Sequence, residues 1–327
     1  MKVQHKAVAS ELVQVNTRSS SFVSDLIDKF LQNKPSYTLP LLAYILSCLL
    51  FSTSPVAIKT ALQYYSPSVL LFWCMFLAML TILPFAVKDL KQFRIRSRRE
   101  ALLLVLLVLA DPIAYFGFEA LAVQYGSASQ AGMTSATSPM IITLFAWFFL
   151  RERFSKLVWA GLAISVVGVM ILTGGTEVSE SASNPLLGTL FMVLSKCGAG
   201  FFIIILRYFE GRFPLSTIVC IQFLVASIFY TPAVIAEPNF GLSLGVVPLL
   251  LILYQGSVIT LGGQILSAYG SSYAPSYLIG MLSPLQPLAA VLLSILLLGE
   301  HLTPFQWSAF AFILFGMYIC QRFKGCR

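Results

Sequence analysis

Long apolar stretches alternate with short polar turns along most of this chain. From residue 39 onward, runs of about 20 mostly apolar residues recur, each long enough to cross a ~30 Å hydrocarbon layer as a helix. The pattern predicts ten membrane-spanning helices: Leu39–Ala61, Ser68–Val87, Ala101–Val123, Ser127–Leu150, Leu157–Gly174, Leu186–Leu206, Pro214–Ala236, Val246–Ser267, Pro275–Leu298 and Phe305–Arg322.

Residues 1–38 precede these spans and are mostly polar. Apolar side chains recur at helical spacing between Phe22 and Leu31, with acidic and basic residues between them. This pattern predicts a short amphipathic helix that lies in the cytoplasmic interface of the membrane. A tail that binds a partner protein is the alternative.

One stretch of about forty residues occurs twice, with an offset of 148 positions. The first copy contains Gly132, Met133, Ser135, Pro139, Leu150, Glu152, Trp159 and Gly168, and the second contains Gly280, Met281, Ser283, Pro287, Leu298, Glu300, Trp307 and Gly316. Each copy belongs to a set of five predicted spans, which is an odd number, so the two sets must have opposite orientations. The sequence therefore predicts an all-α membrane protein built from two inverted five-helix repeats, residues 39–174 and 186–322.

Composition and charge agree with this class. The chain is 58% apolar and only 10% charged, whereas soluble domains carry about 25% charged residues. Nineteen of the 21 Lys and Arg residues fall in the termini and alternate turns, and the other turns, including Thr176–Asn184, have none. By the positive-inside rule both termini are cytoplasmic, and we expect a bacterial inner membrane or its eukaryotic equivalent. The net charge of +8 therefore does not indicate nucleic-acid binding.

Four charged residues fall inside the apolar spans. Counting 1.5 Å per helical residue places Asp111 and Lys196 level near the midplane, and places Lys59 and Glu119 level near the outer interface. Ionisable groups at such depths are costly and are functional candidates by default. We therefore predict the pairs Asp111–Lys196 at a substrate site and Lys59–Glu119 at a gate. A purely structural ion pair is the alternative for each.

Two prolines occupy matching positions in the repeats. Pro139 and Pro287 each free the carbonyl four residues earlier, at Ser135 and Ser283. Broken helices at matching points of inverted halves indicate a central binding site, although a simple kink is the alternative. Further polar side chains that we expect in the wall of this site are Tyr115, Tyr254 and Gln255.

Other recurrent residues favour structural roles. Glu152 and Glu300 each follow a span, where capping is favoured over substrate contact. Gly161, Gly168 and Gly316 form small-residue stripes that predict close helix packing or the seam of a homodimer. The six cysteines show no paired spacing, so we expect no disulfide framework, metal site or cofactor.

Taken together, these features resemble the EamA branch of the drug/metabolite transporter superfamily. The segments that carry the resemblance, between Leu39 and Arg322, are Ala57–Ile58–Lys59, Ser66–Pro67, Arg151–Glu152–Arg153 and Leu298–Gly299–Glu300. The resemblance implies a ten-helix inverted-repeat bundle, alternating access and small organic solutes as cargo. One departure is Cys74, which stands where the family often has an arginine.

We therefore predict a secondary transporter of small polar or amphipathic metabolites. The opposite charges of Asp111 and Lys196 suit a zwitterion such as an amino acid or a derivative of one. No phosphate-binding loop of the Walker type is present, so we expect no direct use of ATP. A channel or structural membrane protein is the first alternative. An intramembrane enzyme is the second, and we predict against it because both histidines lie outside the spans and no catalytic serine or paired aspartate motif occurs.

Overall fold

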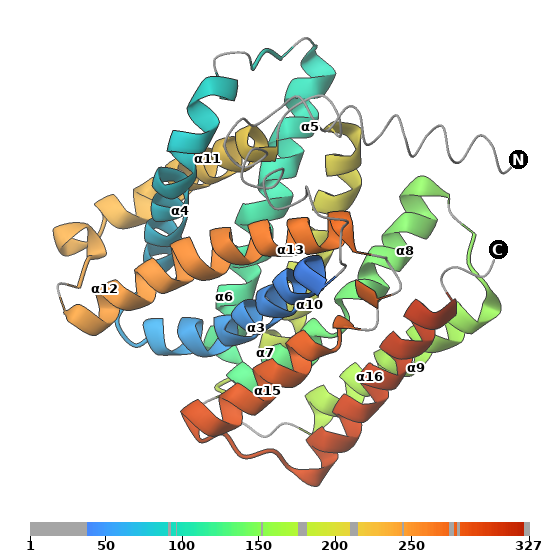
Figure 1. The fold of residues 1–327 in the computed structure, drawn as a ribbon. Coiled ribbons are helices and arrows are strands. Elements are labelled where there is room, and N and C mark those ends of the chain that lie inside the picture. The colour runs from blue at the N-terminus through green and yellow to red at the C-terminus, as the bar shows by residue number, and fades with distance from the viewer. Residues whose placement is uncertain are drawn as a thin grey trace, which may run out of the picture.

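The protein is all-helical over the residues that the computed structural model describes, namely 38–90, 93–95, 97–151, 153–175, 182–209, 215–243, 245–274, 278–279 and 282–323 (Figure 1). Its elements are α3 Thr38–Ala61, α4 Pro67–Leu90, α5 Arg98–Val108, η2 Leu109–Ala114, α6 Tyr115–Tyr125, α7 Ala128–Ser135, α8 Ser138–Leu150, α9 Lys156–Gly174, α10 Pro185–Phe209, α11 Leu215–Ile235, η3 Pro238–Gly241, α12 Val246–Leu253, η4 Tyr254–Gly262, α13 Gly263–Tyr273, α15 Leu285–Leu298 and α16 Pro304–Phe323. The predicted N-terminal amphipathic helix and Glu152 lie outside the described residues.

Most of these helices are apolar and long enough to span a membrane. Among the described residues, seven helices meet that length and hydropathy, and the bent pair α7–α8 makes an eighth. Helix α15 is apolar but shorter, at 14 residues. Large apolar side chains such as Phe148, Met170 and Leu296 are exposed on the surface, where lipid would cover them. The chain is therefore a multi-pass membrane protein.

The backbone extends the repeat well beyond the residues that match in sequence. Helix α5 begins at Arg98 and α12 begins at Val246, which are 148 positions apart. Helices α6 and α13 end at the corresponding Tyr125 and Tyr273, and each is preceded by a π-helical segment, η2 or η4. Each half therefore folds as a copy of the other, including the irregular part of its third span.

The end of the fourth span in each half shows the same correspondence. Arg151 follows α8 with φ 54°, and the matching Gly299 follows α15 with φ 65°. Glycine adopts this left-handed conformation freely, whereas a residue with a Cβ pays roughly 1–2 kcal/mol. The same turn is therefore formed in both repeats, and it costs conformational free energy at Arg151 in the first repeat but not at Gly299 in the second.

The two repeats interdigitate rather than lying side by side. Helix α3 of the first repeat packs against α13 and α15 of the second, and α10 of the second packs against α6 and α8 of the first. Figure 1 shows α3 in the middle of the bundle, close to α13 and α15. Because each first helix is surrounded by the opposite repeat, neither half has a complete core alone.

The last helices of the repeats, α9 and α16, pack along each other (Figure 1). A Cβ at Gly161 would lie 2.8 Å from the carbonyl oxygen of Gly316, and one at Gly168 would lie 2.8 Å from the Cγ1 of Ile313. Helices can approach this closely only where side chains are missing. The predicted close packing is confirmed, and the stripe faces the other repeat of the same chain.

Candidate functional site

A cavity of about 430 Å³ lies between the two repeats. This is within the range of small-molecule binding sites, roughly 300–1,000 Å³. Polar side chains in its lining come from both halves: Tyr44, Tyr115, Ser135, Ser138, Lys196, Ser283, Gln286 and Gln321. Phe51, Ile142, Ile279 and Met317 contribute apolar wall.

Lys196 is the charged residue of this lining. It lies on α10 and is only 3% exposed. Its Nζ donates to the hydroxyl of Tyr115 at 3.4 Å and sits 4.6 Å from the centre of the same ring, a cation–π arrangement. The structure thus places the predicted residues Tyr115 and Lys196 together in the cavity wall.

Close packing of α10 against η2 and α6 fixes the positions of Lys196 and Tyr115 relative to each other. A Cβ at Gly198 would lie 2.7 Å from the carbonyl oxygen of Ala110 in η2 and 3.1 Å from the nitrogen of Tyr115, so glycine lets α10 approach η2 and the start of α6. The Ser195 hydroxyl then donates to the carbonyl oxygen of Tyr115 at 2.8 Å. Lys196, which follows Ser195, is thereby held beside the Tyr115 ring.

Two buried carboxylates lie behind Lys196. Asp111 in η2 is 7% exposed and Glu119 in α6 is 6% exposed, and both interact electrostatically with Lys196. Asp111 has extended backbone angles, φ −146° and ψ 121°, and its carbonyl oxygen accepts a hydrogen bond from Gln222 Nε2. Neither carboxylate lines the cavity. The structure therefore brings Asp111 and Lys196 close enough to interact, as predicted, but Asp111 is buried and does not line the cavity across from Lys196.

The matched serines and prolines do line the cavity. Ser135 ends α7, Pro139 lies in the first turn of α8, and the two helices meet at 41°. In the second repeat a turn at residues 283 and 284 precedes α15, and Pro287 lies in the first turn of that helix. The predicted helix break at these positions is confirmed. The Ser283 hydroxyl accepts a hydrogen bond from Gln321 Nε2 at 2.6 Å, which links the break to α16.

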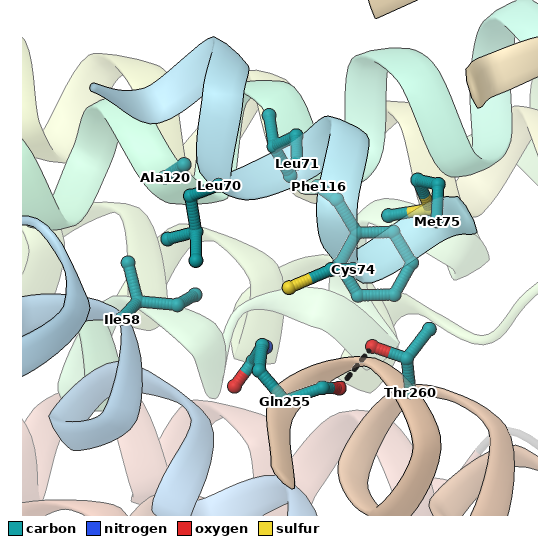
Figure 2. Close-up of a pocket in the computed structure, with 9 residues that line it drawn as sticks. All are labelled: Ile58, Leu70, Leu71, Cys74, Met75, Phe116, Ala120, Gln255 and Thr260. Atoms are coloured by element: carbon teal, nitrogen blue, oxygen red, sulfur yellow. Dashed lines mark hydrogen bonds between the residues drawn. The ribbon is translucent and has the colours of Figure 1, made fainter. Parts of the chain in front are cut away.

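Tyr254 and Gln255 lie away from this cavity, contrary to prediction. The Tyr254 hydroxyl is 2.8 Å from the Thr53 hydroxyl, and Gln255 Nε2 donates to the Ser54 hydroxyl at 3.0 Å. Gln255 and Cys74 line a second, mostly apolar pocket, where Thr260 donates to the Gln255 carbonyl oxygen (Figure 2). Both residues were expected in the wall because their side chains are polar, and polarity alone does not tell which neighbour a side chain binds.

Lys59, in the last turn of α3, and Glu300, which follows α15, both make hydrogen bonds to the backbone around the turn between α6 and α7. Lys59 Nζ donates to the carbonyl oxygens of Val123 and Gly126, both at 2.9 Å. The carboxylate of Glu300 accepts from the backbone N–H groups of Ala128 and Ser129 at 2.9 and 2.8 Å. The lysine thus satisfies carbonyls at a helix C-terminus, and the glutamate caps a helix N-terminus.

This arrangement corrects one prediction and confirms another. Lys59 interacts electrostatically with Glu300, whereas Glu119 interacts with Lys196, so the predicted Lys59–Glu119 pair is wrong. Residues at one depth can face different sides of their helices, and Glu119 faces α10. The capping role expected of Glu300 is confirmed, and it caps a helix of the opposite repeat.

The same end of the bundle is closed by further contacts that the sequence did not indicate. Gln130 Nε2 donates to the carbonyl oxygen of Pro185 at 2.8 Å and to the Thr189 hydroxyl at 2.7 Å. A Cβ at Gly188 would lie 2.7 Å from the Cα of Gly126, so two backbones touch here. Glycine is frequent in membrane helices, and a single glutamine does not indicate its partner, so only the fold brings these residues together.

The cavity and this closed end lie at opposite ends of the bundle. Tyr44, which lines the cavity, lies early in α3, whereas Lys59 lies in its last turn. Gln321, another lining residue, lies near the end of α16, at the other end of that helix from Glu300. A molecule in the cavity would thus be sealed from one face of the membrane by Lys59, Glu300 and Gln130.

Comparisons with known proteins give a consistent result. A family model described as the EamA-like transporter family matches residues 38–174 and 186–321. The "Uncharacterized transporter YcxC" of Bacillus subtilis (strain 168) is 25% identical over 299 residues, covering 88% of this chain and 92% of the relative. An "Uncharacterized transporter" of Clostridium kluyveri is 24% identical over 284 residues, covering 84% of this chain and 90% of the relative.

A third relative matches over a shorter region. The "Uncharacterized transporter YetK" of Bacillus subtilis (strain 168) is 24% identical over 203 residues, which is 60% of this chain and 61% of the relative. A solved crystal structure resembles 87% of this chain and 96% of its own, with a TM-score of 0.59 at 19% identity. That structural likeness shows the fold alone.

Proposed function

This chain belongs to the EamA-like transporter family, and for this reason we propose that it is a secondary transporter that moves small polar or amphipathic metabolites by alternating access. The observation that carries the proposal is the cavity between the repeats, with Lys196 and Tyr115 in its wall and a closed end above it. A binding site that reaches one face while contacts seal the other is what a carrier needs in one half of its cycle.

The inverted repeats supply the other half of the cycle. Because the halves are copies in opposite orientations, exchanging their two conformations would close the present opening and open the present seal. The bends at Pro139 and Pro287 lie beside the cavity in both halves, where a helix can flex with little loss of hydrogen bonding. We assign to these bends the gating motion.

We further propose ten spans, with α15 and α16 completing the second repeat. Helix α16 has 20 residues, enough to cross the hydrocarbon layer. If the basic turns are cytoplasmic, the cavity lies toward the cytoplasm and the Lys59–Glu300 end lies outside. The conformation described is then the inward-facing state, in a bacterial inner membrane.

A vesicle experiment tests this function. The purified full chain would be reconstituted into liposomes and offered an isotopically labelled metabolite extract, and the compounds retained would be identified by mass spectrometry. We expect a small set of compounds that accumulate saturably, and loss of that accumulation with Lys196→Met. Retention equal to that of protein-free liposomes, or uptake that rises without saturation as in a channel, contradicts a carrier.

A further inference from the structure

We infer that the cavity takes an organic anion whose acidic group binds the Lys196 ammonium, and that one proton enters with each anion, on the buried pair of Asp111 and Glu119. This inference rests on the proposed transport function and adds the charge class of the substrate and its coupling ion. It differs from a zwitterion site, in which a carboxylate would face a substrate ammonium.

The lining of the cavity points to the anion. Among its described lining residues Lys196 is the charged one, and no carboxylate contributes to the wall. The ammonium has three donors, and the Tyr115 hydroxyl at 3.4 Å is the acceptor that the described residues provide. A buried donor gains most from an anionic acceptor, because charge-assisted hydrogen bonds are the strongest. A carboxylate, sulfonate or phosphate group fits this need.

The other lining residues indicate what the part of the substrate away from its acidic group is like. Phe51, Ile142 and Met317 offer apolar and aromatic surface, and Ser135 and Ser283 offer hydroxyls from the two repeats. An apolar or aromatic body with few polar groups matches this lining. The site therefore suits an amphipathic organic anion and does not suit a free inorganic ion.

The binding of a proton together with the anion follows from the balance of buried charge. Asp111, Glu119 and Lys196 are all at least nine-tenths buried and interact electrostatically with one another. Two carboxylates and one ammonium leave one excess negative charge, which a low-dielectric interior disfavours. One proton on the carboxyl pair makes the empty site neutral. An arriving anion adds a charge, and a second proton on the pair restores neutrality.

The position of the three acidic and basic groups allows this exchange. Tyr115 and Glu119 are four residues apart in α6 and so share one side of that helix, and Lys196 of α10 packs against Tyr115 and interacts electrostatically with both Asp111 and Glu119. Tyr115 lines the cavity and also interacts electrostatically with the carboxyl pair. A proton gained by the pair would therefore be felt by the anion through the same ammonium.

The other titratable groups packed against this segment are neutral or distant. The Tyr230 hydroxyl of α11 donates to the Ile113 carbonyl oxygen at 3.2 Å. The Cys74 thiol of α4 lies with Phe116 in the second pocket (Figure 2). Lys59 of α3 binds carbonyl oxygens at the far end of α6. Among the described residues, the acidic groups that interact electrostatically with Lys196 are therefore Asp111 and Glu119.

The charge class can be tested with four compounds of one shape. The probes are 3-phenylpropane-1-sulfonate, 3-phenylpropyltrimethylammonium, phenylalanine and 3-phenylpropan-1-ol, which present an anion, a cation, a zwitterion and a neutral group. Thermal unfolding of the purified full chain would be followed with each. We expect the sulfonate to stabilise saturably and more than the others. We also expect about tenfold weaker binding in Lys196→Met, as the loss of a charge-assisted hydrogen bond implies, and partial rescue in Lys196→Arg.

Several results would overturn the anion site. They are stronger stabilisation by the cation or by phenylalanine, stabilisation by none of the four, or a sulfonate effect that Lys196→Met leaves unchanged. Because these readouts concern binding, a chain that accumulates metabolites in vesicles but prefers phenylalanine would refute the anion and leave transport intact.

The proton is measured in the same binding reaction. The sulfonate stays ionised across the working pH, so any proton taken up in a weakly buffered solution belongs to the protein. We expect uptake of about one proton per sulfonate bound, by proton linkage. The uptake should vanish in Asp111→Asn/Glu119→Gln, and it should remain near one proton in Glu119→Gln alone, because Asp111 and Lys196 are then neutral together when the site is empty and Asp111 takes the proton when the anion binds. Binding without proton uptake in the unmodified chain, or uptake that persists in the double variant, contradicts the coupling.

Discussion

The Ser165 hydroxyl of α9 donates a hydrogen bond of 3.2 Å to the carbonyl oxygen of Ile313 of α16, and these two residues are separated by the repeat offset of 148. A residue that touches its own counterpart must lie on the axis that relates the two halves. The α9–α16 seam is therefore the place where the two repeats contact each other through residues at matching positions. Its small residues allow α9 and α16 to pack this closely.

Adding side chains along this seam should destabilise the protein. We expect Gly316→Leu to lower the free energy of unfolding by about 1–3 kcal/mol or more, because a Cβ there would meet the carbonyl oxygen of Gly161 at 2.5 Å. Gly174→Ala at the end of α9, the helix that packs against α16, is the control, since its Cβ would meet nothing within 4 Å. Melting of the detergent-purified variants checks this. Equal melting temperatures for Gly316→Leu and the control would show that the seam is loose.

Loss of the Glu300 cap should open the sealed end. Glu300→Gln removes the charge from two hydrogen bonds to the start of α7, at a cost of roughly 1–2 kcal/mol. A reporter cysteine at Ala131, which is 3% exposed, should then react faster with a membrane-impermeant maleimide from the Glu300 side. The exposed Glu237→Gln is the control. If both glutamate variants label the reporter at the wild-type rate, Glu300 does not hold the seal.

The orientation in the membrane follows from the basic residues. On a background without native cysteines, Arg94→Cys should resist an impermeant reagent applied outside intact cells, and Ser183→Cys should react with it. Both positions are exposed, so burial does not decide the result. Labelling of position 94 from outside would invert the topology and place the cavity opening on the outer face.

The two prolines beside the cavity should affect motion more than folding. Pro287→Ala restores a backbone N–H and stiffens the start of α15, so we expect a several-fold lower transport rate at normal expression. Pro84→Ala, which lies within α4 and away from the cavity, is the matched control. Vesicle uptake at equal protein amounts measures both. Normal uptake with Pro287→Ala would remove the gating role.

Part of this architecture could be predicted from the sequence. The 148-residue offset is visible because Gly, Pro, Glu and Trp recur in register, and those residue types are needed at turns and helix breaks. That register led to the two repeats and to the helix breaks at Pro139 and Pro287.

The partners of the buried charges could not be predicted in the same way. A count of depth does not give the side of the helix that a residue faces, so it could not show that Lys59 interacts with Glu300 and Glu119 with Lys196. Asp111 lies in the irregular segment η2, and Tyr254 and Gln255 bind Thr53 and Ser54 of α3, contacts that the pattern of apolar and polar residues does not contain. The cap of Ala128 by Glu300 joins opposite repeats, and a contact of that kind depends on the complete fold.

Alternating access itself is tested most directly by distances at the two ends of the bundle. One pair of spin labels would be placed at Tyr64 and Ser183 near the sealed end, and a second pair at Arg94 and Arg153 near the cavity end, in otherwise identical proteins in lipid nanodiscs. Pulsed electron–electron double resonance would record both distance distributions with and without the metabolites that the vesicles retain. We expect the ends to respond in opposite directions, with the first distance lengthening as the second shortens. Distances that stay fixed, or that lengthen together at both ends, would contradict a carrier that opens one end at a time.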